Sequence, residues 1–566
     1  MFSKAAEKTS SLFILVGAPF TTVFLMTGSV TDPVNATKLA AAGALAFGLL
    51  GIALFFNIKT LVRESKLFFL LALGFLFAAM NAAINSDSPL TQNIYGSFGR
   101  NTGFVAYVSL LSLSVSALTF RERSSFKRII LGLQAAGFIN ALYCLWVLLF
   151  GDFLSWSNPY GNILGLFGNP NFISSFLGIF IATLLAQLVA PHVALFARLG
   201  YAFMALVAFY EIVKSNSVQG IVVTAGAVSI VGFFAIKHWI RNRFILLLYS
   251  ALNVAVGVTA IMGALQKGPW TFIYKTSVSL RGAYWDAGLR MGWEHPLTGV
   301  GMDSYGDWYR RARSEQAATV LPGPNTISNA AHNVAIDFFA YGGFPLMIAY
   351  LGMLILAAIA SVKVISRTKG YDSVFVAMFA AWSCYQVQSI ISINQVGLAL
   401  WGWILTGALI AYERATRLEV RDDELPKRKN RKPDTRPSAS VISPQLIAGL
   451  SLVVGTLIAV PPLSADTRWR TALDSKDANK VIAALEPGYL NPSNSQRYAQ
   501  AVQLFASSNL MDQAREIALD GIEYNPEFFD AWKLVYFLSN STEEEKELAL
   551  KNMKRLDPRN PNVLAQ

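Results

Sequence analysis

His332 and Arg281 are the residues of this chain best placed to do chemistry. Both belong to a long polar segment, 266–333, between two strongly apolar segments. His332 stands at the start of a predicted helix, whose positive end favours a neutral imidazole and hence a general base near pH 7. Arg281 carries a planar guanidinium that can bind two phosphoryl oxygens at once. The segment therefore predicts a site for a phosphate-bearing substrate.

Three more cations are expected near this segment, namely Arg100, Lys214 and Arg290. Gathered at a membrane surface, they would help Arg281 to bind a diphosphate. The alternative is that the cations pair with loop carboxylates, and that His332 only caps its helix. Pairing is the favoured interpretation for one cluster of loop arginines, Arg310, Arg311 and Arg313, with Asp286, Glu294, Asp303 and Asp307 as the loop carboxylates.

Other residues of the segment have less specific chemistry. His295 precedes Pro296 in a predicted turn and is expected to serve structure. Four aromatic side chains offer flat faces for sugar rings, although they could equally form the core of the loop: Trp285, Trp293, Tyr305 and Trp308.

Motifs of several other enzyme and transporter classes are missing from the sequence. There is no phosphate-binding loop ending in Gly-Lys-Ser/Thr, no H-E-x-x-H or Cys/His metal spacing, and no G-x-S-x-G. The acidic residues of the loop form no D-x-D pair. The sequence thus predicts neither a metal nor a cofactor, and it gives no support for ATP-driven transport or serine hydrolysis.

The composition is that of a membrane protein. Of the 566 residues, 54% are hydrophobic and only 14% are charged, whereas soluble proteins carry about 25% charged residues. The net charge of +12 is attributed to cytoplasmic connections and not to nucleic-acid binding. Cys144 and Cys384 fall in apolar segments, so no disulfide is predicted.

The expected fold is all-α, with about thirteen transmembrane helices and no cleavable signal peptide. The polar segment 266–333 forms a large loop between the ninth and tenth helices. Lys and Arg concentrate in alternate connections, which places the N-terminus in the cytoplasm and the large loop outside. The thirteen apolar segments are 11–28, 36–57, 67–84, 103–120, 129–150, 170–190, 199–213, 219–236, 244–264, 335–362, 373–393, 396–412 and 444–463.

Beyond the polytopic domain, 1–412, the sequence predicts three further parts. Residues 413–443 are basic and contain prolines, as in a disordered cytoplasmic linker near anionic lipid. Residues 444–463 form the last transmembrane helix, and 464–566 form an extracytoplasmic tail. In the tail, Asn-Pro or Asp-Pro turns recur at 490–492, 524–526 and 556–558, at a period typical of tetratricopeptide repeats. The alternative is a plain helical bundle packed on the loop.

Several motifs resemble the O-antigen ligase and polymerase superfamily of bacterial membrane glycosyltransferases, which have the GT-C type of fold. They are R-x-x-x-W at 281–285, P-L-T-G-V-G at 296–301, A-H-N-V at 331–334 followed by G-G-F-P-L at 342–346, and G-N-P-N-F at 168–172. The match covers about residues 10–412 and is strongest over 281–345.

The resemblance implies a metal-independent, inverting enzyme of the bacterial plasma membrane. Such enzymes take a glycan from undecaprenyl diphosphate and attach it to a glycan, lipid or protein acceptor outside the membrane. His332 and Arg281 would be the essential residues, and Asn333 of the same motif would contact substrate. Where the family usually has an arginine after a serine, this chain has Gln219. Gln219 would then donate neutral hydrogen bonds, with Lys214 or Arg100 restoring the charge.

Three activities of this superfamily stay open at this point: ligase, polysaccharide polymerase and protein O-oligosaccharyltransferase. The repeats of the tail favour a large acceptor or a protein partner, because tetratricopeptide surfaces bind peptides. A lipid-linked glycan exporter or a membrane scaffold is the alternative from another class. An exporter would be expected to show repeated spans or midplane charges, and neither is evident.

Overall fold

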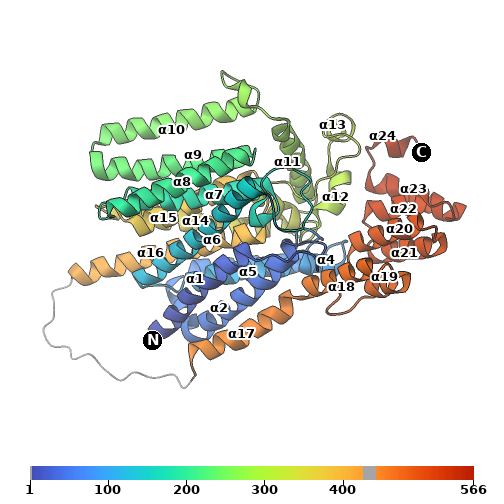
Figure 1. Cartoon of the computed structure of the whole chain (residues 1–566), viewed down its shortest axis with the longest axis horizontal. Coiled ribbons are helices and arrows are strands. Elements are labelled where there is room, and N and C mark those ends of the chain that lie inside the picture. Colours follow the sequence, from blue (N-terminus) through green and yellow to red (C-terminus); the bar gives the residue numbers. More distant parts are fainter. Residues whose placement is uncertain (1–2, 425–441) are drawn as a thin grey trace.

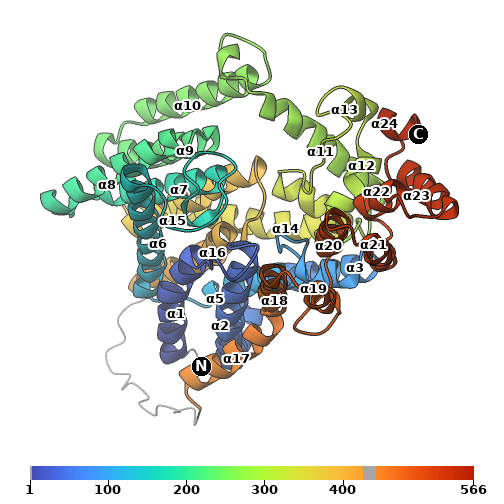
Figure 2. The same cartoon turned by 45° about the vertical axis from the view of Figure 1, so that its right-hand side comes forward.

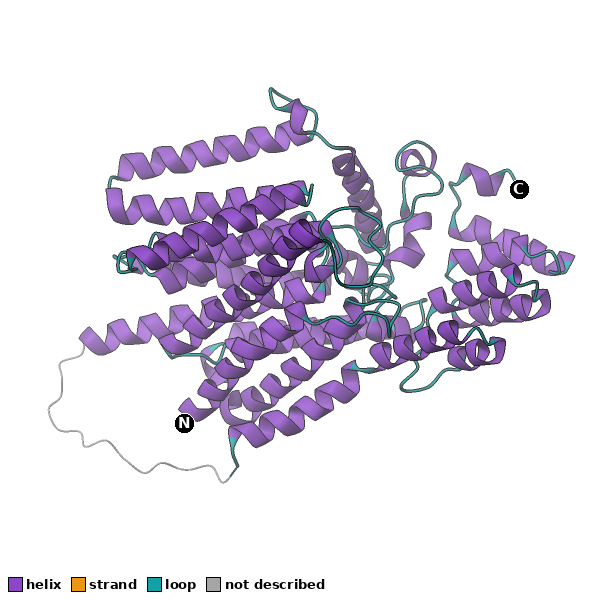
Figure 3. Cartoon of the chain, viewed as in Figure 1, coloured by secondary structure: helices purple, strands orange, loops and turns teal. Residues whose placement is uncertain are grey.

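The computed structural model describes residues 3–424 and 442–566, which contain helices and loops but no β-strand (Figure 3). Thirteen helices overlap the thirteen predicted apolar segments. They are α1 (Lys4–Val23), α2 (Asn35–Glu64), α3 (Lys66–Ile84), α5 (Phe104–Ala117), α6 (Arg123–Phe150), α7 (Pro170–Leu188), α8 (Leu195–Lys214), α9 (Val218–Ala235), α10 (Arg243–Ala264), α14 (Val334–Arg367), α15 (Ser373–Ile390), α16 (Val396–Glu424) and α17 (Pro444–Ala459).

The all-α membrane fold is confirmed. Among the described residues, nine helices are long and apolar enough to cross a membrane. A tenth span results if α17 and α18 (Pro461–Ser475), which meet at a bend of 49°, are counted together. Thirteen crossings stay a prediction. The central helix is α16, since 94% of its apolar stretch is buried, whereas α10 lies at the edge with 0% buried.

The large loop and the tail lie at one end of the bundle, and the N-terminus lies toward the other (Figure 1). This arrangement is the one that the predicted topology requires, while the assignment of the loop end to the outside stays a prediction. The loop carries α11 (Thr276–Glu294), α12 (Tyr305–Ala312) and α13 (Glu315–Thr319), and α4 (Leu90–Tyr95) lies beside it. The tail helices are α18, α19 (Ala478–Leu485), α20 (Ser495–Ser507), α21 (Met511–Tyr524), α22 (Phe529–Phe537), α23 (Glu543–Leu556) and α24 (Pro561–Leu564).

The predicted linker begins later than expected. Helix α16 continues to Glu424, so residues 413–424 are helical and not irregular. Part of this extension is held by ion pairs, since Arg367 binds Glu413 at 3.1 Å and Arg414 reaches Glu64 at 3.5 Å. The rest of the predicted linker, 425–441, lies outside the described residues.

Helix α14 is interrupted where the large loop meets it. Gly342 and Gly343 leave the helical conformation, and Gly343 has φ +63° and ψ −159°. The freed backbone groups bond to the loop: Val300 N donates to Ala340 O at 2.8 Å, and Phe344 N donates to Pro296 O at 2.8 Å. Glycine is required at 343, because a Cβ would lie 2.2 Å from Pro296 O. The break thus fixes the loop to a membrane helix.

Helix α12 lies beside the tail helices (Figure 2), and the arginines at its end, Arg310, Arg311 and Arg313, join the loop to the tail. Arg313 and Asp557 are fully buried, and Arg313 Nη2 donates to both carboxylate oxygens at 2.8 and 2.9 Å. Arg310 also contacts Asp557, at 3.2 Å, and Arg311 pairs with Glu527. These arginines were predicted to pair with carboxylates of the loop, and that prediction was wrong. They pair instead with acidic residues at two of the repeated turns of the tail.

We expect Arg313→Ala to destabilise the docked tail by about 3–5 kcal/mol, because it leaves a buried carboxylate unpaired. The control is Lys546→Ala on α23, which removes an exposed pair with Glu543 and should cost at most about 1 kcal/mol. Thermal unfolding and limited proteolysis of the purified protein measure the difference. Equal effects of the two substitutions would contradict a role of the Arg313–Asp557 pair in docking.

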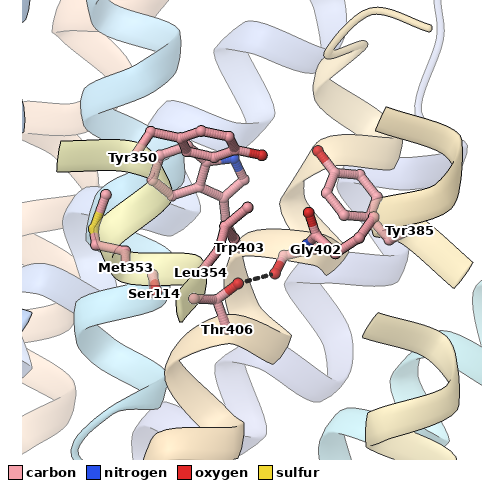
Figure 4. A pocket seen from close by; sticks show the side chains of 9 residues that line it. Ser114, Tyr350, Met353, Leu354, Tyr385, Gly402, Trp403 and Thr406 are labelled. Atoms are coloured by element: carbon pink, nitrogen blue, oxygen red, sulfur yellow. Dashed lines mark hydrogen bonds between the residues drawn. The ribbon is translucent and has the colours of Figure 1, made fainter. Parts of the chain in front are cut away.

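A small cavity of about 10 Å³ lies inside the bundle, between α5, α14, α15 and α16 (Figure 4). Thr406 Oγ1 donates to Gly402 O at 2.8 Å beside it. Ser114 Oγ, Gln386 Nε2 and Trp403 Nε1 face no hydrogen-bond partner within residues 3–424 and 442–566. A space of this size holds about one water molecule, so it cannot be a substrate site.

Candidate active site

His332 occupies the turn that leads into α14. Its backbone is left-handed, with φ +58°, a conformation that few residues other than glycine, asparagine and aspartate adopt readily. The next residue, Asn333, is the N-cap, and its side-chain oxygen accepts hydrogen bonds from Ala335 N at 3.1 Å and Ile336 N at 3.2 Å. Asn333 thus has a structural task, and it frees His332 from capping the helix.

The surroundings of His332 keep its imidazole neutral. Its ring lies 5.7 Å from the ring of Tyr284 on α11. Burial lowers the pKa of His332 to about 4, and the positive charges of Arg100 and Arg281 add to this effect. A neutral imidazole can accept a proton, as a general base must. Both predicted arginines therefore lie within electrostatic range of the histidine.

Arg281 projects from α11 toward the connection between α15 and α16. Its Nε donates to Ile391 O at 3.0 Å, and Nη1 lies 3.5 Å from Ser277 O. Burial lowers the pKa of Arg281, and no carboxylate among the described residues pairs with it. A guanidinium has five N–H donors, so most of its donors and its whole charge remain for an anionic ligand.

Arg100 has a different environment. Only 6% of the residue is exposed, and Nε lies 3.3 Å from Asp303 Oδ1. Nη2 donates to Tyr341 OH at 3.1 Å, and Nη1 donates to Asn329 O. Burial opposes the charge, but Tyr341 and Asp303 hold the pKa of Arg100 above its ordinary value. Arg100 is therefore a fixed, partly compensated cation that ties the 96–103 loop to the segment before His332.

A cavity of about 840 Å³ opens beside Arg100. This volume is within the range of ligand sites, about 300–1,000 Å³. Asn169 and Phe172 of the G-N-P-N-F motif line it, as do Ile393 and Gln395 of the same connection that Arg281 contacts. The other aromatic lining residues come from the 151–169 loop, and they are Trp156, Tyr160 and Phe167.

The structure does not bring every predicted site residue to this place. Arg290 follows Arg281 by nine residues, which is two and a half helical turns and puts it on the opposite side of α11, about 13 Å along the axis. It pairs there with Asp286 at 3.0 Å. Helical periodicity alone could have excluded it. Lys214 is exposed at the end of α8, with its Nζ 5.5 Å from the ring of Tyr210.

Gln219 lies near the cavity but not in its lining. It is 4% exposed, and neither amide atom has a hydrogen-bond partner among the described residues. The preceding turn contacts the motif region, since Ser217 Oγ donates to Asn171 Oδ1 at 2.8 Å. Gln219 therefore has unused hydrogen-bonding capacity close to the G-N-P-N-F motif.

Two of the four aromatic residues predicted as sugar platforms, Tyr305 and Trp308, are buried in the loop core, whereas Trp293 is 65% exposed. Tyr305 is fully buried, and its hydroxyl donates to Tyr284 O at 2.6 Å. Trp308 packs under Arg311 and beside His295, while Trp293 contacts Phe339 and Phe344. The cavity takes its aromatic rings from the 151–172 region instead. The sequence could have indicated this lining, because Trp, Tyr and Asn are frequent in the 151–172 region.

We expect any reaction that uses His332 as its base to keep its rate down to about pH 5 and to lose it only near pH 4, because protonation of His332 removes the base. An unfolded histidine takes up its proton near pH 6.5. Folding stability should therefore fall as the pH drops from 6.5 toward 4. Initial rates measured from pH 3.5 to 8 test this. An acid limb near 6.5 would show that the catalytic base lies in an ordinary aqueous environment.

Comparison with known families bears on the same segment. Residues 173–351 match the family model described as O-Antigen ligase, and no curated protein matches the chain. The matched segment runs from α7 into α14, so it includes Gln219, Arg281 and His332. The match supports a membrane glycosyltransferase of the ligase or polymerase type. Over residues 173–351, the chain is therefore similar to the O-antigen ligase family.

Proposed function

We propose that this protein transfers a glycan from undecaprenyl diphosphate to an acceptor hydroxyl on the outer side of a bacterial plasma membrane, without a metal ion. The observation that carries the proposal is the uncompensated guanidinium of Arg281 beside the neutral imidazole of His332. A cation that lacks an acidic partner suits a diphosphate, and a neutral histidine suits an attacking hydroxyl.

The reaction follows from these roles. The acceptor oxygen attacks the anomeric carbon, and His332 takes the hydroxyl proton. The bond between the anomeric carbon and the phosphate oxygen breaks on the opposite face, which inverts the configuration. Arg281 stabilises the negative charge that develops on the departing diphosphate. Because diphosphate is a good leaving group, positioning and charge stabilisation supply most of the catalysis.

The cavity of about 840 Å³ is the proposed place for the first sugars of the donor glycan. Its mixture of aromatic rings and amide side chains is suited to sugar rings and their hydroxyls. Arg100 and Arg470 are its lining cations, while Asp32 is its lining carboxylate.

The proposal is tested with purified protein in detergent, an undecaprenyl-diphosphate-linked oligosaccharide, several acceptors and EDTA. We expect release of undecaprenyl diphosphate together with a glycosylated product. The mass of the product then distinguishes a ligase, a polymerase and a protein O-oligosaccharyltransferase. If undecaprenyl diphosphate is released from none of the lipid-linked donors with any acceptor, an exporter or a scaffold is favoured.

A further inference from the structure

A second cavity, of about 240 Å³, lies between the large loop and the tail. One wall is formed by Phe98 of the 96–103 loop and by Asp303 and Asn329 of the large loop. The other wall comes from the turns of the tail, through Tyr524 and the residues 493–496 and 528–530. The Tyr524 hydroxyl lies 2.8 Å from Thr91 Oγ1 and donates to Ser493 O at 2.8 Å, which fixes this wall against the membrane domain.

The size of this cavity fits a small ligand. At about 30 Å³ per water molecule, it corresponds to about eight waters, which is the space of a single sugar ring. It is smaller than the pockets for drug-sized molecules, about 300–1,000 Å³. The cavity therefore selects one ring of a larger molecule and not an extended chain.

The lining is suited to a neutral saccharide. Phe98, Tyr524 and Phe528 provide aromatic surface against which the apolar face of a sugar can pack. Three carboxylates line it, from Asp303, Asp307 and Asp530. Asp303 pairs with Arg100 and Asp530 pairs with Arg310, so no cation among the described lining residues lacks an acidic partner. Carboxylates accept hydrogen bonds from sugar hydroxyls, and the described lining has no free positive charge that would favour a phosphate or uronic acid group.

The cavity is adjacent to the reaction centre. Asn329 lines it and precedes His332 by three residues, which limits the distance between their Cα atoms to about 11 Å. Asp303 lines it as well and pairs with Arg100, which in turn lines the larger cavity. The Arg100 side chain thus stands between the two spaces, close to His332.

We infer that this smaller cavity binds one neutral sugar residue of the acceptor, held jointly by the tail and the large loop. The assignment of this sugar to the acceptor rests on the proposed function. If the donor glycan occupies the larger cavity, the smaller cavity remains for the acceptor. It assigns the tail a direct part in acceptor selection.

The test is ligand-observed saturation-transfer NMR on the full chain in detergent. The probes are neutral di- and trisaccharides of glucose, galactose and N-acetylglucosamine, with a glucuronic-acid disaccharide as the anionic comparison. Two variants alter the cavity: Phe528→Ala removes an aromatic wall, and Gln496→Trp fills the space from an exposed position. The matched control is Phe537→Ala, which changes the same residue type at the far, exposed end of α22.

We expect a saturation-transfer signal from at least one neutral saccharide with the wild type and with Phe537→Ala. With each of the two cavity variants, this signal should be at least fivefold weaker. No signal from any neutral saccharide would overturn the inference. So would a stronger signal from the anionic disaccharide, or equal signals from Phe528→Ala and Phe537→Ala. The experiment needs neither donor nor transfer, so its failure is distinguishable from failure of the proposed reaction.

Discussion

Replacing His332 by Asn is expected to lower the rate of glycan transfer by about 10²–10⁴-fold, the usual contribution of a general base. Asn suits the left-handed backbone at this position but cannot take the proton of the acceptor. The fold should persist, because Asn333 and not His332 caps α14. Product formation by the purified variant, with its melting temperature beside it, measures both effects.

The matched control for this prediction is His295→Ala, which removes the other histidine of the large loop. Its ring packs against Trp308 at 4.8 Å, so transfer should continue at close to the wild-type rate. Comparable losses in both variants would indicate that the histidines support the loop. Transfer at the full rate by His332→Asn would rule out a catalytic His332.

Replacing Arg281 by Ala should lower the rate by about 10²–10³-fold, as expected when a group that stabilises transition-state charge is removed. Arg281→Lys keeps the charge but loses the planar fork, so it should recover only part of the rate. The loss should appear in kcat more than in the KM of the acceptor, because the charge on the diphosphate increases during bond cleavage.

Arg290→Ala is the control for Arg281, since it removes the same residue type from the opposite side of α11. Its exposed pair with Asp286 contributes at most about 1 kcal/mol, and transfer should be unchanged. If Arg290→Ala lowered the rate as far as Arg281→Ala, the general charge of α11 would account for both effects. Arg281 would then have no specific role at the diphosphate.

The helices could be predicted because an apolar segment of about 20 residues spans a membrane as an α-helix, in which all backbone hydrogen bonds are satisfied. Their ends were harder, and α16 shows why: residues 413–424 are polar, yet ion pairs such as Arg367–Glu413 extend the helix. Charge pattern alone cannot show whether such residues remain in solvent or pair across helices.

The candidate site could also be predicted only in part. His332 and Arg281 were predicted because their types and the family motifs mark them, and the structure places them close together. The burial of Arg100 against Asp303 was not predictable, since the two are 203 residues apart and nothing local links them. The same holds for Arg313 and Asp557, whose pairing depends on how the tail folds back.

The Arg313–Asp557 pair also has a consequence for how the protein is made. Asp557 follows every membrane helix in the chain, so the ribosome adds it after the large loop and all of its arginines. Until then Arg313 lacks its buried partner, and the smaller cavity lacks the wall that the tail provides. The nascent protein therefore completes the surface between the large loop and the tail only after Asp557 has been added.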